Sequence, residues 1–371
     1  MTDTTLFYEP IEVSPPGDTL RDLMEERDLS QAELSRRLGR PTQAINEILA
    51  GKKEITEDTA IELERVLQVP AHFWLTREAQ YREYLARLRA IQANRAAVPW
   101  VQTFPLKALQ QAKVLPAGRL TAKFVETLVE PMLSFFGVGS PEGWGAQYEQ
   151  LQVQFRRARP EAQTNVAGIT AWLRMGEIQA QQLDVQSFDA AALERALPAM
   201  RALTVADAAT IGTELTRLCA QVGVVLVFVP ALQGTHVSGV ARWLHGKPLV
   251  QLSLLGKWND TFWFSFFHEI GHILKHPSRR AVFLDDASSG ALVTATEELD
   301  ADRFAADVLI PLLLVKELEK LPLTKKDIQA FAAQAHLHAG IVVGHLQHHG
   351  RLPWAHPLTH LKARYEIQNK G

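Results

Sequence analysis

The stretch FWFSFFHEIGHILKH, residues 262–276, constrains the fold of this chain more than any other. His268 and His272 stand four residues apart, so on an α-helix their imidazoles lie about 40° apart on one face and can share one metal ion. An apolar stripe falls roughly opposite that face and contains Trp263, Phe266, Phe267, Ile270, Ile273 and Leu274. The pattern predicts a helix that is anchored by its apolar back and presents two histidines.

Glu269 follows the first histidine, where the pattern H-E-x-x-H places a carboxylate. Such a carboxylate takes a proton from water at the metal and passes it to a leaving amine. A catalytic zinc ion usually has three protein ligands and one open position, so two histidines are one ligand short. The chain must therefore supply a third ligand nearby.

Four carboxylates compete for that position on a predicted helix in TEELDADRFAADVLIP: Glu297, Glu298, Asp300 and Asp302. On a helical wheel, Glu298 and Asp302 share a face with small and apolar residues, whereas the other two acids point toward water. Glutamate has the longer reach, so Glu298 is the predicted ligand, and Asp302 is expected to orient a ligand histidine. The alternative interpretation of this segment is an acidic, solvated helix face.

The remaining histidines are interpreted as structural. His276 lies about 80° from His268 around the helix, which favours a place at the helix end, or a contact to a ligand, over metal binding. Surface positions and helix caps explain a group near the end of the chain: His336, His338, His345, His348 and His349. The single cysteine, Cys219, excludes an internal disulfide and fits a reducing cytoplasm.

Residues 18–76 have the pattern of short helices broken at close intervals. Ser30 begins a capping box and a helix that ends at Gly39, and a second helix, TQAINEIL, follows from Thr42 to Leu49. Two short helices joined by a glycine-containing turn are typical of a helix-turn-helix unit, whose second helix enters the major groove of DNA.

Six residues on or beside that second helix are candidates for DNA contacts: Arg40, Thr42, Gln43, Asn46, Lys52 and Lys53. The amides of Gln43 and Asn46 can pair with adenine, whereas the cations suit phosphates. The net charge of −2 gives no general attraction to nucleic acid, so binding must depend on such a local patch. Glu47 is unfavourable beside DNA, and a helical interaction module is the alternative.

After residue 76 the sequence predicts a helical region first and then a mixture of helices and strands. Residues 77–203 predict a helical connecting region, in which a long charged helix is compatible with packing against a second copy and hence with a homodimer. Residues 204–371 add a β-branched stretch, Val224–Val229, and a hairpin formed by VSGVARWL and LVQLSL around HGKP. A small sheet beside the metal helix suits a zincin, because an edge strand can align an extended substrate.

Length and hydropathy set the general class of protein. A chain of 371 residues with 47% hydrophobic content suggests two or three globular domains. We expect a multidomain, mainly α protein: an all-α helix-turn-helix bundle (18–76), a helical middle region (77–203) and an α+β zincin-like metallopeptidase domain with a small sheet (204–371). No signal peptide and no apolar run of about 18 residues is found, so we expect a cytoplasmic protein with no membrane partner.

Four segments of the second half follow, in order, the pattern of the ImmA/IrrE family of zinc-dependent regulatory metallo-endopeptidases: HVSGVARWLHGKPLVQLSL, DTFWFSFFHEIGHILKH, EELDADRFAADVLIP and AGIVVGHLQHHGRLPW. The amino-terminal region resembles the HigA-like, Cro/C1-type helix-turn-helix regulators that are often fused to that domain. The resemblance implies a regulator that cuts a partner protein, commonly a repressor. It also places the metal-binding glutamate of the family at Glu298.

We therefore expect a transcriptional regulator that binds double-stranded operator DNA and carries a zinc endopeptidase, with a repressor or toxin as its protein partner. His268, His272 and Glu298 would bind zinc, although manganese or iron also suits such ligands, and Glu269 would move the proton. Two alternatives stay open. One is an antitoxin-like repressor whose metal site is structural or catalytically silent, and the other is a metal-sensing repressor that cuts nothing.

Overall fold

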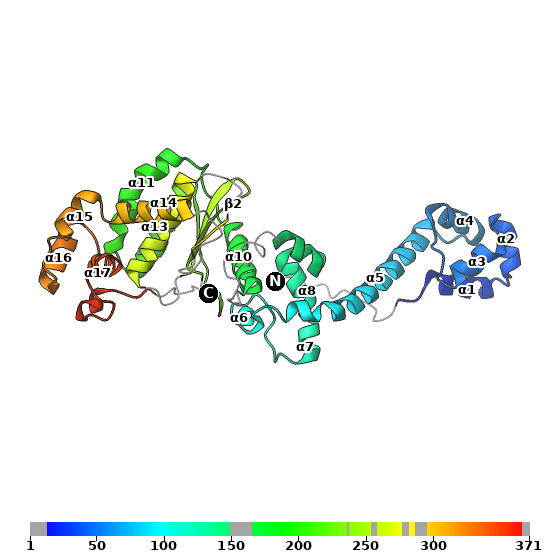
Figure 1. The fold of residues 1–371 in the computed structure, drawn as a ribbon. Coiled ribbons are helices and arrows are strands. Elements are labelled where there is room, and N and C mark those ends of the chain that lie inside the picture. The colour runs from blue at the N-terminus through cyan, green and yellow to red at the C-terminus, as the bar shows by residue number, and fades with distance from the viewer. Residues whose placement is uncertain are drawn as a thin grey trace, which may run out of the picture. The chain divides into compact units, whose positions relative to one another are not determined.

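The computed structural model describes residues 13–148, 165–235, 237–253, 258–276, 282–285 and 295–365. Contacts divide the chain into two compact units, Met1–Val98 and Pro99–Gly371. The first unit is helical throughout its described part, and the second combines helices with a small sheet (Figure 1). The domain limits expected from the sequence stay a prediction, because residues 99–203 group with the residues that follow them. Among the described helices, none has the length and apolarity to cross a membrane.

Short helices build the N-terminal unit: α1 (Pro16–Glu26), α2 (Gln31–Leu38), α3 (Thr42–Leu49), α4 (Glu57–Leu67) and the start of the longer α5 (Ala71–Val101). The hydroxyl of Ser30 accepts a hydrogen bond from the backbone N–H of Glu33, which begins α2 as the capping box predicts. Gly39 ends α2 in the left-handed conformation, with φ of 65°. The core of this unit joins all of these helices and includes Leu20, Leu34, Ile45, Leu63 and Trp74.

Helices dominate the described part of the second unit before its sheet: α6 (Leu106–Gln111), α7 (Ala122–Glu126), α8 (Val129–Phe136), residues 141–148, α10 (Val166–Ala180), α11 (Ala190–Ala202), η1 (Leu203–Val205) and α12 (Ala208–Gln221). Helix α10 is fixed to the sheet by buried polar side chains. The amide of Gln251 donates to the Trp172 carbonyl at 2.7 Å, and the guanidinium of Arg242 donates to Glu177 at 2.6 Å.

Within the described residues, the sheet has four strands in the order β1-β3-β2-β4: β1 (Val225–Phe228), β2 (Gly239–Leu244), β3 (Lys247–Leu252) and β4 (Val282–Asp285). Strands β2 and β3 form the predicted antiparallel hairpin, and the first strand, β1, runs parallel to β3. The turn is made by His245 and Gly246, both with positive φ. Strand β4, which pairs antiparallel with β2, was not expected from the sequence.

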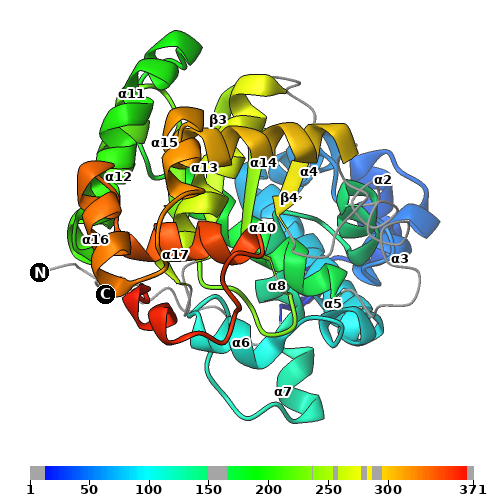
Figure 2. The ribbon, with the colours of Figure 1, turned by 60° about the vertical axis from the view of Figure 1, so that its left-hand side comes forward.

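The metal helix of the sequence analysis is α13 (Asn259–Lys275), and further helices follow it: α14 (Ala295–Leu309), α15 (Leu312–Leu318), α16 (Lys325–Gln334), α17 (Ala339–His348) and η2 (Pro357–Leu361). Helix α13 contacts β2 and β3 as well as α14 and α17, and α14 crosses over it (Figure 2). Its apolar stripe is at most 3% exposed at Trp263, Phe266, Phe267, Ile270 and Ile273. Burial of each such side chain contributes about 1.5–3 kcal/mol, which fixes the opposite face of the helix in place.

Candidate metal centre and helix-turn-helix surface

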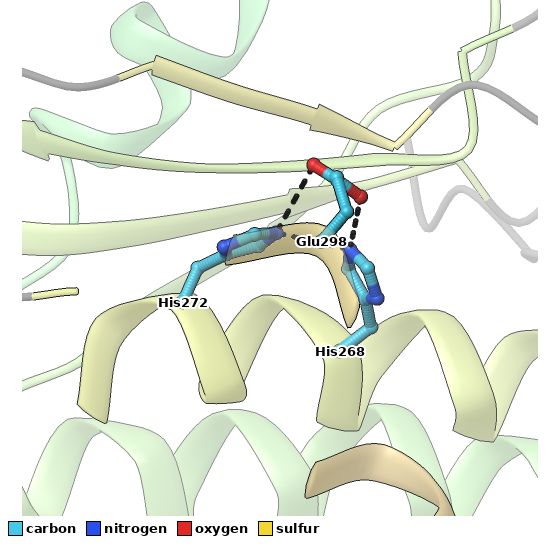
Figure 3. A group of neighbouring side chains, drawn as sticks. All are labelled: His268, His272 and Glu298. Carbon is cyan, nitrogen blue, oxygen red and sulfur yellow. Dashed lines mark hydrogen bonds and ion pairs between the residues drawn. The ribbon is translucent and has the colours of Figure 1, made fainter. Parts of the chain in front are cut away.

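Three polar side chains from two helices converge on one point (Figure 3). His268 Nε2 lies 3.0 Å from His272 Nε2 and 3.3 Å from Glu298 Oε2. His272 Nε2 lies 3.6 Å from Glu298 Oε1. These are the three residues predicted as metal ligands, and the two histidines are at most 3% exposed.

The spacing of these atoms suits a divalent metal ion. In a tetrahedral site with bonds of about 2.0–2.1 Å, neighbouring ligand atoms lie about 3.3 Å apart. The three observed separations, 3.0, 3.3 and 3.6 Å, lie on either side of that value. Two imidazole nitrogens and one carboxylate are also a donor set that such ions accept in catalytic sites. The residues therefore fit a metal ion.

Close packing of α13 against α14 brings the three ligand atoms together. A Cβ atom on Gly271 would lie 3.0 Å from Phe304 Cδ1 and 3.2 Å from Ala301 Cα, so only glycine allows this approach without displacement. Ala301 and Ala305 are fully buried in the contact. The small residues on α14 thus place Glu298, one turn earlier, against the histidines.

Burial decides the protonation of the second histidine. Desolvation, with smaller contributions from His268 and His276, lowers the pKa of His272 from 6.5 to about 3. The imidazole is therefore neutral at pH 7. A neutral imidazole keeps the nitrogen lone pair that binds a metal ion.

The remaining acids of α14 take different positions. Asp302 Oδ1 lies 2.9 Å from His268 Nδ1, so it can accept the Nδ1–H and leave Nε2 directed at the centre. Glu297 instead faces His276, with 3.9 Å between Oε1 and Nδ1. His276 caps the end of α13, as expected. In the described part of the chain, the cluster with metal-ligand spacing contains neither Glu297 nor Asp300.

Glu269 is fully buried on α13, where it lies against the first residue of β2. A Cβ atom on Gly239 would lie only 2.7 Å from Glu269 Oε1. The absence of a side chain at Gly239 therefore leaves space for the carboxylate. No local pattern in the sequence indicates this glycine, because the contact of β2 with α13 is a tertiary one.

The predicted DNA-contacting residues fall into two groups. Gln43, Asn46, Lys52 and Lys53 are exposed on and just after α3, opposite its buried face, and the Gln43 amide donates to Glu47 on the same helix at 3.1 Å. Two others have partners within the same unit: the Arg40 guanidinium donates to Glu62 at 2.5 Å, and the Thr42 hydroxyl donates to Ser35 at 3.2 Å. These contacts fasten the turn between α2 and α3 to α4 and α2.

Comparisons with known proteins assign a family to each end of the chain. Residues 20–74 match the model of the helix-turn-helix family, and residues 220–334 match a peptidase-family model described as the IrrE N-terminal-like domain. The chain thus joins a region that matches a helix-turn-helix family to a region that matches an IrrE-like peptidase family. Both resemblances drawn from the sequence are confirmed.

Individual relatives each match only part of the chain. Repressor protein C of Rhizobium phage 16-3 is 30% identical over 121 residues, which is 31% of this chain and 43% of that protein. The antitoxin HigA of Pseudomonas aeruginosa, solved with the higBA promoter, is 30% identical over 21% of this chain and 86% of its own, with a TM-score of 0.21. A HigA-family addiction module antidote protein from Coxiella burnetii is 28% identical over 22% and 88%, with a TM-score of 0.21.

Proposed function

We propose that the C-terminal unit is a zinc-dependent endopeptidase that hydrolyses a peptide bond in a partner protein. The observation that carries this proposal is the convergence of His268, His272 and Glu298 within 3.0–3.6 Å, with the buried Glu269 directly after His268 on α13. The match to a peptidase-family model over residues 220–334 supports it.

The three converging residues would hold the zinc ion and leave a fourth position open. Bound zinc would supply Lewis acidity, which polarises a peptide carbonyl and makes water more acidic. His272 takes part as a neutral imidazole because burial lowers its pKa. Asp302 holds the ring of His268 in one orientation by accepting its Nδ1–H, and an oriented imidazole binds metal more tightly than a mobile one.

Glu269 is the residue that moves the proton. Its carboxylate accepts a proton from the attacking water and delivers it to the nitrogen of the leaving amine. Contact with Gly239 and complete burial limit the positions that this carboxylate can take. A positioned general acid and base of this kind contributes about 10²–10⁴-fold to a rate.

The sheet supports an extended substrate. Strand β4 is the last strand of the described sheet, next to β2, which reaches Glu269 through Gly239. A peptide that added to this edge would receive backbone hydrogen bonds along its length. Its scissile bond would then be held in an extended conformation beside the centre.

The N-terminal unit, in our proposal, binds operator DNA through α3. The helix-turn-helix family match and the exposed Gln43 and Asn46 support direct contacts to bases, while Lys52 and Lys53 are free to approach phosphates. The similarity to a protein named as a repressor supports a role in transcription. Arg40 and Thr42 would act by shaping the turn.

The test of this function uses purified chain and the proteins encoded by neighbouring genes. The zinc-loaded chain is expected to cleave one of them, and a chelator should stop the cleavage. A chain that binds such a protein tightly, retains zinc and leaves it intact would instead support a repressor with a catalytically silent metal site.

A further inference from the structure

A pocket of about 70 Å³ lies between α13, α14 and α17. Its walls come from all three helices and include Phe264, Ala306, Leu309, Ile310, Ile341 and His345. The deep residues Leu309, Ile310 and Ile341 are at most 5% exposed, whereas Phe264 is 36% exposed. The pocket therefore has an aliphatic floor and an aromatic mouth that faces solvent.

The mouth lies next to the metal centre. Phe264 precedes His268 by one helical turn, and the centroids of their rings are 6.2 Å apart. Ala306 follows Asp302, the partner of His268, by one turn of α14. One turn rises about 5.4 Å, and an extended peptide advances about 3.3 Å per residue. A side chain within about two residues of a bond held at the centre would reach the pocket.

Three of the polar residues that line the pocket carry no unpaired charge. Burial lowers the pKa of His345 to about 4 and lowers the pKa of His348, so both rings are uncharged at pH 7. The carboxylate of Asp260 forms part of the wall and is paired with Lys362, with 2.6 Å between Oδ2 and Nζ. A charged occupant would lose its hydration without gaining a free partner charge, so neutral side chains are favoured.

The size of the pocket selects among neutral side chains. An engineered cavity of about 150 Å³ holds benzene, and this pocket has about half that volume. Helix α17 approaches α13 closely at Gly344 in the pocket wall, where a Cβ atom would lie 2.3 Å from Asp260 Oδ2. A branched aliphatic side chain fits such a space, whereas an aromatic ring requires the walls to move apart.

We propose that this pocket binds a leucine-sized aliphatic side chain of the partner protein, adjacent to the scissile bond. The assignment of that side chain to a substrate rests on the proposed peptidase function. Binding of an aliphatic group by the pocket does not depend on catalysis. The two claims can therefore be tested separately.

The binding test titrates N-acetyl-leucinamide into the full chain with labelled isoleucine methyl groups. We expect saturable shifts of the Ile310 and Ile341 methyl signals, with a Kd at least tenfold lower than for N-acetyl-lysinamide and N-acetyl-phenylalaninamide. Ala306→Phe fills the pocket from a partly exposed position and should abolish these shifts. Ala333→Phe makes the same change on an exposed site of α16 and should leave binding unchanged.

A second variant keeps the test decisive if Ala306→Phe does not fold. Phe264→Ala widens the mouth and should raise the affinity of the phenylalanine probe relative to the leucine probe. Equal affinity for the three probes, or shifts that survive Ala306→Phe in a folded chain, would overturn the proposal. Saturable binding of N-acetyl-leucinamide by a chain that cleaves no partner would support the aliphatic pocket and contradict only the peptidase function.

Discussion

His268 and Asp302 are joined by a contact of 2.9 Å between Nδ1 and Oδ1, made across the interface of α13 and α14. The same imidazole directs its other nitrogen to within 3.3 Å of Glu298. One histidine thus meets two acids of α14, the partly buried Glu298 and the exposed Asp302, each through a different ring atom. This relationship separates a residue that would bind metal from one that would orient a ligand.

Substitution of the acids of α14 should therefore have graded effects on metal affinity. Glu298→Ala removes a ligand and should abolish stable zinc binding. Asp302→Ala should weaken binding by about 10–100-fold, as is typical when a partner of a ligand histidine is lost. Glu297→Ala should change affinity little, because Glu297 faces His276.

Zinc competition with a chromogenic chelator measures all three affinities. The account of the ligand set is wrong if Glu298→Ala retains zinc as the parent does. A larger loss of zinc affinity for Asp302→Ala than for Glu298→Ala would indicate that Asp302 is the ligand and that Glu298 orients the histidine.

Gly239→Ala should separate catalysis from metal binding. The new methyl group would lie 2.7 Å from Glu269 Oε1, so the carboxylate must move. We expect zinc content and folding to persist, because the far end of a side chain can shift, while kcat for cleavage of the partner falls at least tenfold. A variant with unchanged kcat would show that the position of this carboxylate is not set by β2.

Substitutions on α3 should separate base recognition from phosphate binding. Gln43→Ala and Asn46→Ala should each lower affinity for the operator by about 1–3 kcal/mol and relax base choice at one position. Lys52→Ala should weaken binding to specific and random duplexes alike and reduce the salt dependence of the affinity. Fluorescence anisotropy on both duplexes distinguishes these effects, and equal losses for Gln43→Ala on both would rule out direct base contacts by that residue.

The pocket histidine should make stability depend on pH. Burial lowers the pKa of His345 to about 4, below the value of about 6.5 expected in the unfolded chain. The unfolded state thus binds the proton more readily, so stability is complete above about pH 6.5 and decreases as pH falls toward 4, by at most about 1.4 kcal/mol per pH unit.

His345→Gln should therefore lose less stability than the parent between pH 7 and pH 5. Urea unfolding at the two pH values measures the difference. The exposed His360 provides a matched control, and His360→Gln should keep the pH dependence of the parent. Identical pH profiles for His345→Gln and the parent would contradict the effect assigned to burial.

Local patterns in the sequence carry much of this structure. Helix α3 begins and ends at the predicted Thr42 and Leu49, and Ser30 caps α2 through the expected hydrogen bond. The metal cluster was also predictable, because a four-residue spacing fixes two histidines on one helix face. A helical wheel places Glu298 and Asp302 together on the side of α14 that faces a neighbour, and the longer reach of glutamate favours Glu298 as the ligand.

Contacts between distant segments were not predictable in this way. The ion pair with Glu62 joins Arg40, a predicted DNA contact, to α4, and nothing in the local pattern indicates this pairing. His345 was expected at a surface or a helix cap, yet it lines a pocket between three helices. His338, by contrast, does cap α17. Periodicity gives the face of a helix but not the identity of its neighbour.

In the proposed mechanism, Glu269 moves the proton in a zinc-dependent cleavage. The most direct measurement compares the zinc-loaded parent with Glu269→Gln on the partner protein, following product by mass spectrometry and zinc by elemental analysis. We predict that the variant binds one zinc ion per chain, as the parent does, and that its cleavage rate falls by about 10²–10⁴-fold. Cleavage by Glu269→Gln at the rate of the parent would contradict the mechanism.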